Sequence, residues 1–277
     1  MGDRSNAPVR PRTCVAGLGL LLALAAGSAG AQSAAGGPGA AAGGAAAPAA
    51  GATPAPAAAA GCTARPLPMD GKAPPWGHAP LSRLKKDTRY ELTTQEGRQV
   101  LMAQADGSAS LYGTSFRPAR GSGGWLRWSW KTDALVPDAD NADPRREDAP
   151  LRVVVAFDGD AAKLPLGERA RRKMAATMTG RPPPYAALIY IWGSREALGT
   201  VIPSAHTSQI KMIVVQSGTE GLGRWHDVRR NLREDYRRAF GSAAGPVVAV
   251  AVMTDTDNTG KQAAGMYSGF AFDCAAR

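Results

Sequence analysis

The residues best suited to chemistry form a short acidic segment near the C-terminus, residues 255–258, with the sequence DTDN. Asp255 and Asp257 stand at alternate positions ahead of Gly260, as the first ligands of a calcium-binding loop do. The position that would need a bidentate glutamate holds a methionine, so the segment is not an EF-hand. Asp255, Asp257 and Asn258 are therefore candidate ligands of a Ca²⁺ ion. The alternative is a tight turn closed by the Asp and Asn side chains.

Carboxylates elsewhere in the chain would have to complete a calcium site or a catalytic pair. The candidates are Asp158 and the neighbouring acids Glu147 and Asp148. A glycan hydrolase needs two carboxyl groups on opposite sides of a cleft, so Asp255 or Asp257 would act with Asp148 or Asp158. The three histidines lack metal-ligand spacing, and the chain has neither a G-x-S-x-G motif nor a Walker loop. The sequence leaves catalysis open and favours binding.

A second candidate surface lies on the aromatic segment 125–131, WLRWSWK. Side chains of a strand alternate between its faces, so Trp125 and Arg127 share the polar face and Trp128 and Trp130 the core face. An exposed indole beside cations stacks on a sugar ring or holds an anionic glycan. The alternative is that Trp125 only begins the strand and packs under a loop.

Apolar and alternating segments predict the strands that position these residues. They cover residues 88–93, 99–104, 110–116, 125–131, 152–158, 186–192, 209–216, 247–254 and 266–273. Gly, Asp, Asn and Pro separate them. Such a series with variable connections predicts an all-β, jelly-roll-like β-sandwich, similar in outline to carbohydrate-binding modules.

Helical periodicity predicts two accessory α-helices, at residues 168–179 and 225–240. The second carries five arginines and three acidic residues. Opposite charges three or four residues apart pair along a helix, so we interpret this face as solvated and partly self-paired and not as a polyanion site.

Residues 1–31 have the pattern of a secretory signal peptide, with a basic start, an apolar run at 15–26 and small residues at 29–31. The run is shorter than the about 20 residues that span a bilayer, and Cys14 precedes it, so no lipidated cysteine marks the cleavage site. We expect a periplasmic or secreted protein with no transmembrane segment after cleavage. Residues 32–80, rich in Ala, Gly and Pro, predict a disordered tether, and residues 81–277 the sandwich domain.

The cysteines and the net charge fit an exported protein. Cys62 and Cys274 remain after cleavage and bracket the folded part, so we expect a disulfide between them, the alternative being two free thiols. The formal net charge of +10 at pH 7 falls to +8 after cleavage, through loss of three Arg and one Asp, and this surplus favours an anionic partner such as an envelope polymer. No nucleic-acid-binding motif is present.

Six blocks of the sequence resemble an uncharacterised bacterial family, domain of unknown function 3047. They are LRWSWK at 126–131, EDAPLRVVVAFD at 147–158, ALIYIWGS at 187–194, IKMIVVQSG at 210–218, WHDVRRNLREDYRRAFG at 225–241 and VAVMTDTDNTG at 250–260. Their order and spacing are similar over residues 81–273. The resemblance implies an exported single-domain protein and no assigned reaction.

These observations together predict a non-catalytic domain that binds a glycan or an anionic envelope polymer, supported by Ca²⁺ at the acidic segment. Two other classes stay open. One is a glycan hydrolase that uses the loop carboxylates, and the other is a structural protein of the cell envelope without a small ligand.

Overall fold

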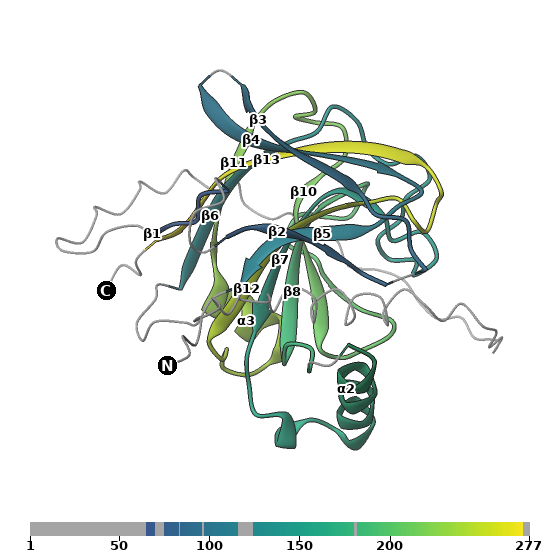
Figure 1. The fold of residues 1–277 in the computed structure, drawn as a ribbon, viewed down its shortest axis with the longest axis vertical. Helices are drawn as coiled ribbons and strands as arrows, with labels where there is room; N and C mark the ends of the chain where they lie inside the picture. The colour runs from purple at the N-terminus through teal and green to yellow at the C-terminus, as the bar shows by residue number, and fades with distance from the viewer. Residues whose placement is uncertain are drawn as a thin grey trace, which may run out of the picture.

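The computed structural model describes residues 65–69, 75–82, 84–95, 97–115, 124–179 and 182–273, which form two β-sheets packed face to face (Figure 1). Sheet A has the strand order β11-β6-β13-β4-β3, with β1 paired to the end of β13, and every pair is antiparallel. Its strands are β1 Arg65–Pro66, β3 Arg89–Gln95, β4 Arg98–Asp106, β6 Trp125–Lys131, β11 His226–Asn231 and β13 Gln262–Asp273.

Sheet B has seven strands in the order β2-β5-β12-β7-β8-β10-β9, of which only β8 and β10 pair in parallel. Two packed, mainly antiparallel sheets whose neighbouring strands are mostly not consecutive in the chain form a jelly-roll-like β-sandwich. Its strands are β2 Gly77–Pro80, β5 Ser110–Ser115, β7 Ala149–Phe157, β8 Ala186–Gly193, β9 Val201–Pro203, β10 Ile210–Ser217 and β12 Val247–Asp255.

Large aromatic side chains fill the space between the sheets. Trp128 and Trp130 of β6 reach Tyr190 and Trp192 of β8, with ring centroids 5.3 and 6.4 Å apart. Each ring buries roughly 200 Å², which at roughly 25 cal/mol per Å² contributes about 5 kcal/mol before entropy is counted. This core confirms that the aromatic segment directs one face inward.

The centre of sheet B is buried on both faces. Every residue of β7 and β8 is buried, because one face meets sheet A and the other carries a second apolar cluster that includes Val154, Ile189, Ile191 and Met212. This second cluster lies on the outer face of sheet B, the side away from sheet A. Helix α2 (Leu166–Thr179), in the connection from β7 to β8, adds the buried Ala175 to it (Figure 1).

The helix predicted over residues 225–240 is wrong in its first half. Residues 226–231 form β11, which pairs antiparallel with β6 from His226 opposite Trp130 to Asn231 opposite Trp125. Helix α3 (Leu232–Phe240) begins only after Asn231, whose side-chain oxygen accepts hydrogen bonds from the next turn's amides. The single apolar Val228 fits a helical stripe and an alternating strand equally, and pairing with β6 decides between them.

The other predicted elements are confirmed, with ends that shift by four residues or fewer. The sandwich begins before Leu81, because β1 and β2 pair with β13 and β5 inside the segment expected to be a tether. The predicted signal peptide (1–31), Cys62 and Cys274 lie outside the described residues. Across the described residues, no helix has the length and apolar character needed to cross a bilayer.

Candidate functional site

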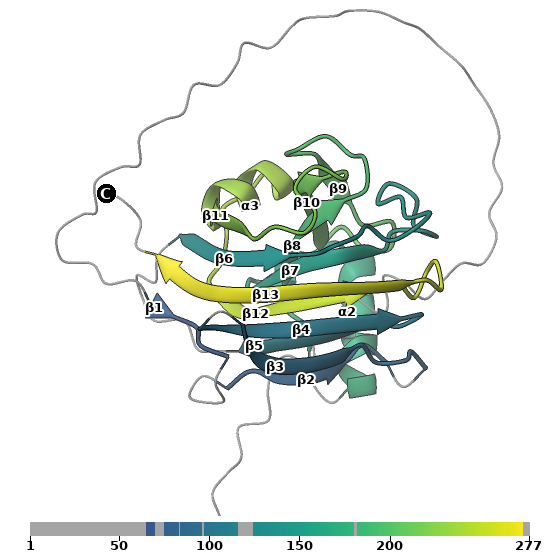
Figure 2. The same cartoon turned by 90° about the horizontal axis from the view of Figure 1, so that it is seen from above.

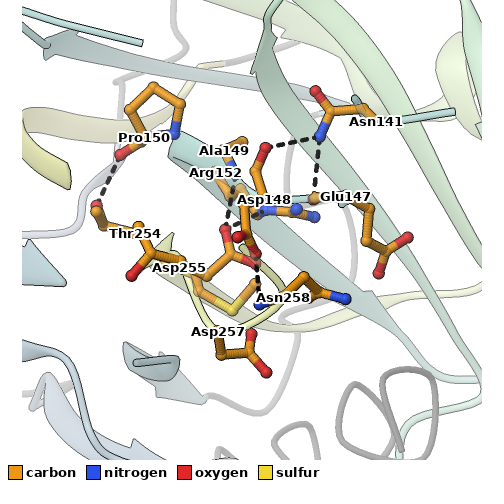
Figure 3. Close-up of polar contacts among 12 residues, drawn as sticks. Asn141, Glu147, Asp148, Ala149, Pro150, Arg152, Thr254, Asp255, Asp257 and Asn258 are labelled. Carbon is orange, nitrogen blue, oxygen red and sulfur yellow. Dashed lines mark hydrogen bonds and ion pairs between the residues drawn. The ribbon is translucent and has the colours of Figure 1, made fainter. Parts of the chain in front are cut away.

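The acidic segment forms a tight turn directly after β12. The amide of Gly260 donates to the carbonyl of Thr256 at 2.8 Å, and Gly260 adopts a left-handed φ of 68°. Asn258 donates its side-chain Nδ2 to the carbonyl of Pro144 at 2.9 Å. The turn is closed by this backbone bond and not by the Asp and Asn side chains of the turn alternative, and Asn258 ties the loop to the segment before β7 (Figure 3).

Asp148, directly before β7, is the main anchor of this loop (Figure 3). Its Oδ1 accepts from the amide of Asn258 at 3.2 Å. Its Oδ2 accepts from the amide and the hydroxyl of Thr259 at 2.7 and 2.6 Å. Asp148 is fully buried, so these bonds replace the solvation of its carboxylate.

Asp255 forms the buried centre of the site with Arg152 of β7 (Figure 3). Its Oδ1 accepts from Arg152 Nε at 2.8 Å and from the amide of Ala149 at 3.0 Å. Arg152 is only 2% exposed, although it begins an otherwise apolar run. A small pocket opens beside this pair on the outer face of sheet B.

Two carboxyl groups of this pocket, those of Asp255 and Glu147, have raised pKa values. Burial raises the pKa of Asp255 to about 7, and the negative charges of Asp148 and Asp257 add to the rise while Arg152 opposes it. Burial also raises the pKa of Glu147, against the same opposition from Arg152. The carboxyl groups around the pocket outnumber the side-chain cations, so Arg152 keeps its charge. Asp255, with its pKa of about 7, takes up a proton near neutral pH.

Convergent carboxylates satisfy one requirement of a calcium site. Asp148, Asp255 and Asp257 each offer an oxygen within 4.8 Å of the others. Lys85 pairs with Asp257, and Arg152 with Asp255, so two side-chain cations already balance part of this charge. Calcium binding stays a prediction, and the ion would have to compete with Lys85.

The geometry gives less support to a catalytic carboxyl pair. Asp158, one of the predicted partners, lies at the far end of β7, where its Oδ1 accepts from the amide of Gly159. Asp148 reaches the loop, but both its oxygens accept hydrogen bonds from the loop. The pocket volume of about 20 Å³ is close to what one water needs, far below the room for a sugar ring.

Trp125 lies on the outer face of sheet A, the side away from sheet B, and is partly exposed. Arg229 of the neighbouring β11 lies over its indole ring, with Cζ 4.1 Å from the ring centroid. Trp125 therefore contacts a cation on the polar face of β6, and its role in binding a glycan stays a prediction.

Arg127 follows on the same face and shares an acid with Arg229. Asp273 accepts from Arg127 Nε at 3.1 Å and from Arg229 Nε at 3.0 Å. A groove of about 300 Å³ adjoins Arg127, between residues 66–69 and the bulge of β13 at Gly269. Figure 2 shows this face of sheet A, with β1 beside the end of β13.

A second arginine–tryptophan pair belongs to the same face. Arg98 lies over Trp225, with Cζ 4.9 Å from the ring centroid. Trp225 directly precedes β11 and lies four residues before the outward-facing Arg229, so the alternation of strand side chains places it on the same face. Sequence reasoning missed both pairs because it placed residues 225–231 on a helix. It also missed Arg152, for which the only signal was a lone arginine at the start of a doubly buried strand.

The described residues define a jelly-roll-like β-sandwich with a polar pocket on one outer face and arginine–tryptophan pairs on the other. The sequence profile of the family described as "Protein of unknown function (DUF3047)" matches residues 74–271, so the chain belongs to that family. Among proteins with curated functions, none matches the chain in sequence.

Solved glycanase structures show a distant likeness. The xyloglucanase domain of NopAA from Sinorhizobium fredii, in complex with cellobiose, has a TM-score of 0.34 at 9% identity, over 72% of this chain and 97% of that one. Endoglucanase 3 of Trichoderma harzianum, from family GH12, has a TM-score of 0.34 at 8% identity, over 67% and 84%. The family 11 xylanase of Neocallimastix patriciarum has 0.29 at 8%, over 78% and 94%. Likeness at this level carries no site or activity over to this chain.

Proposed function

We propose that this protein is a non-catalytic binding domain for an anionic glycan or a similar anionic polymer, held on the outer face of sheet A, in the periplasm or outside the cell. One observation carries the proposal. A groove of about 300 Å³ adjoins Arg127 on the same sheet face as the stacked Trp125–Arg229 pair. A concave surface with a few fixed polar groups is the general form of a ligand site.

Asp273 holds the two arginines ready for an anion. It accepts the Nε–H of Arg127 and of Arg229 and thereby fixes both guanidinium groups. Among the described residues, the terminal nitrogens of both groups have no hydrogen-bond acceptor. Those nitrogens are donors for a carboxylate, sulfate or phosphate group on a polymer, and such charge-assisted bonds are the strong ones.

Trp125 supplies the apolar part of the same surface. Arg229 covers one face of its indole ring, so a sugar ring would stack on the opposite face. Arg98 and Trp225 extend the positive, aromatic character across the sheet. The formal net charge, +10 for the whole chain and +8 without residues 1–31, adds long-range attraction to a polyanion, which salt would screen.

Affinity electrophoresis of the full chain in gels that contain polymer tests the proposal. We expect retardation by an acidic polysaccharide such as polygalacturonate, little retardation by a neutral β-glucan, and weaker binding as salt rises. Arg127→Ala and Trp125→Ala should each weaken binding about tenfold, equivalent to about 1.4 kcal/mol. Arg169→Ala on α2, an exposed residue outside this face, removes the same charge and should bind as the wild type does.

Three outcomes would contradict the proposal. Equal losses in Arg127→Ala and Arg169→Ala would indicate attraction by net charge alone. Absence of binding to every polymer would favour a structural envelope protein. Release of new reducing ends during incubation with a polysaccharide would favour the hydrolase.

A further inference from the structure

The pocket on the outer face of sheet B lies on the opposite side of the sandwich from the proposed polymer surface. Met212 and Ile210 of β10 form an apolar wall, and Arg152, Glu147 and Asp255 supply polar groups. The partly exposed Ser204 and Asn258 also line it, so the pocket is open to solvent on their side. Its volume of about 20 Å³ admits one water-sized group.

Arg152 is the residue that indicates a ligand. Its Nε donates to Asp255 at 2.8 Å, and its Nη1 points to Met212 Sδ, a weak acceptor, at 3.3 Å. Its Nη2 is buried and has no hydrogen-bond partner among the residues that the structure describes. A buried donor left without an acceptor is costly, so an oxygen atom in the pocket would relieve the penalty.

The charged groups around the pocket determine which kind of ligand group can bind there. An anion would meet the carboxyl groups of Glu147, Asp255 and Asp257. A cation would meet Arg152 and Lys85. A hydroxyl group satisfies both sets, because it accepts a hydrogen bond from a guanidinium and donates one to a carboxylate.

We propose that this pocket binds a hydroxyl group of a small neutral polyol or of a neutral sugar end group. Arg152 Nη2 donates to the hydroxyl oxygen, and the hydroxyl donates to the carboxyl of Asp255 or Glu147. The carbon that bears the hydroxyl packs against Met212 and Ile210, and the rest of the ligand lies at the opening. This site is separate from the polymer surface of sheet A, and the proposal for it does not depend on polymer binding there.

Thermal unfolding and titration calorimetry of the full chain test this proposal. Glycerol, glucose and xylose would each be added at 10 mM or below, a range in which non-specific stabilisation by excluded osmolytes is small. Acetate and calcium serve as the anionic and cationic comparators. At least one neutral ligand should raise the Tm and give heat of binding, since a ligand that binds only the folded state stabilises it.

Variants separate the pocket from general effects. Ser204→Phe fills the opening and should abolish the Tm rise. Ala162→Phe, an exposed change outside the pocket, should leave it intact. Glu147→Gln should weaken binding several-fold, because an amide accepts a hydroxyl proton less strongly than a carboxylate. Arg152→Met removes the donor but leaves Asp255 without its ion-pair partner. If Arg152→Met does not fold for that reason, Ser204→Phe is the variant that tests the pocket.

The contrary outcomes are distinct. No Tm rise with any polyol means that the pocket holds water only, and a rise that survives Ser204→Phe places the ligand elsewhere. A rise with calcium or acetate but with no polyol assigns the pocket to an ion. Each of these results overturns the proposal, and none depends on whether sheet A binds a polymer.

Discussion

Replacing Asp148 by asparagine should loosen the acidic loop. The two carboxylate oxygens accept three hydrogen bonds, at 3.2, 2.7 and 2.6 Å, from Asn258 and Thr259. Asparagine offers one oxygen, so its amino group must face at least one donor of the loop. Losing one charge-assisted bond costs about 1.5 to 3 kcal/mol, and the bonds that survive become neutral and weaker. Relief of repulsion with Asp255 offsets part of this loss.

We therefore expect Asp148→Asn to lower the free energy of unfolding by about 2 to 3 kcal/mol, measured by urea denaturation at pH 7. The amides of Asn258 and Thr259 should lose protection in hydrogen exchange. The pKa of Asp255 should fall in the same variant, because the charge of Asp148 raises it in the native protein. Carboxyl-carbon NMR titration would measure that change.

Asp138→Asn is the matched control. Asp138 is exposed, its carboxylate pairs only with Lys261 among the described residues, and its φ of 64° is one that asparagine tolerates well. Its effect should stay within about 0.5 kcal/mol. If Asp148→Asn costs no more than this control and the loop amides stay protected, Asp148 is not the anchor of the loop.

Three further predictions concern packing, capping and pH. Gly113→Ala should destabilise the fold by several kcal/mol or prevent expression, because its Cβ would lie 2.4 Å from the Cβ of Ala251. Asn231→Ala should cost about 1 kcal/mol by removing the N-cap of α3, measured by thermal unfolding. The folded Asp255 keeps its proton up to about pH 7, whereas the unfolded group loses it near 3.8, so this group's contribution to stability falls as pH rises between those values. Asp255→Asn should flatten that part of the Tm profile, and an unchanged slope would contradict the assignment.

The sequence was sufficient for most strands because their patterns are local. Residues 149–157, apart from Arg152, and residues 186–193 are apolar on both faces, and both are central strands of sheet B. Trp128 and Trp130 share one parity on β6, and both face the core. Burial patterns of this kind belong to the segment itself, so no knowledge of its partners was needed.

The wrong helix prediction for residues 226–231 shows that a local sequence pattern does not reveal pairing with a distant strand. Residues 226–231 contain one apolar residue, Val228, and their strand conformation depends on pairing with β6, almost one hundred positions earlier in the chain. Helix propensity is a weak preference that tertiary pairing overrides. The two arginine–tryptophan pairs of sheet A could not be predicted without that pairing.

The candidate pocket was predictable only in part. Asp255 and Asp257 were recognisable as a cluster, and Asp148 was among the acids expected to join them. Arg152 and Lys85 were not, because a cation in a buried cluster is selected by the surplus of negative charge that the fold gathers there. The sequence around Arg152 and Lys85 contains no pattern that predicts this surplus of negative charge.

The pairing of β1 with β13 is the shortest contact between strands of sheet A. Only two residue pairs join these strands, extended by one hydrogen bond from the Leu67 amide to the Phe270 carbonyl. The disulfide expected between Cys62 and Cys274 would carry the load of a pull on the chain that precedes Arg65. With free thiols at Cys62 and Cys274, such a pull would instead load this short contact first, and its few hydrogen bonds would break before the longer ladders of sheet A. Residues 66–69 form one wall of the groove beside Arg127, so peeling opens the groove. Grip on a bound polymer would then weaken under load.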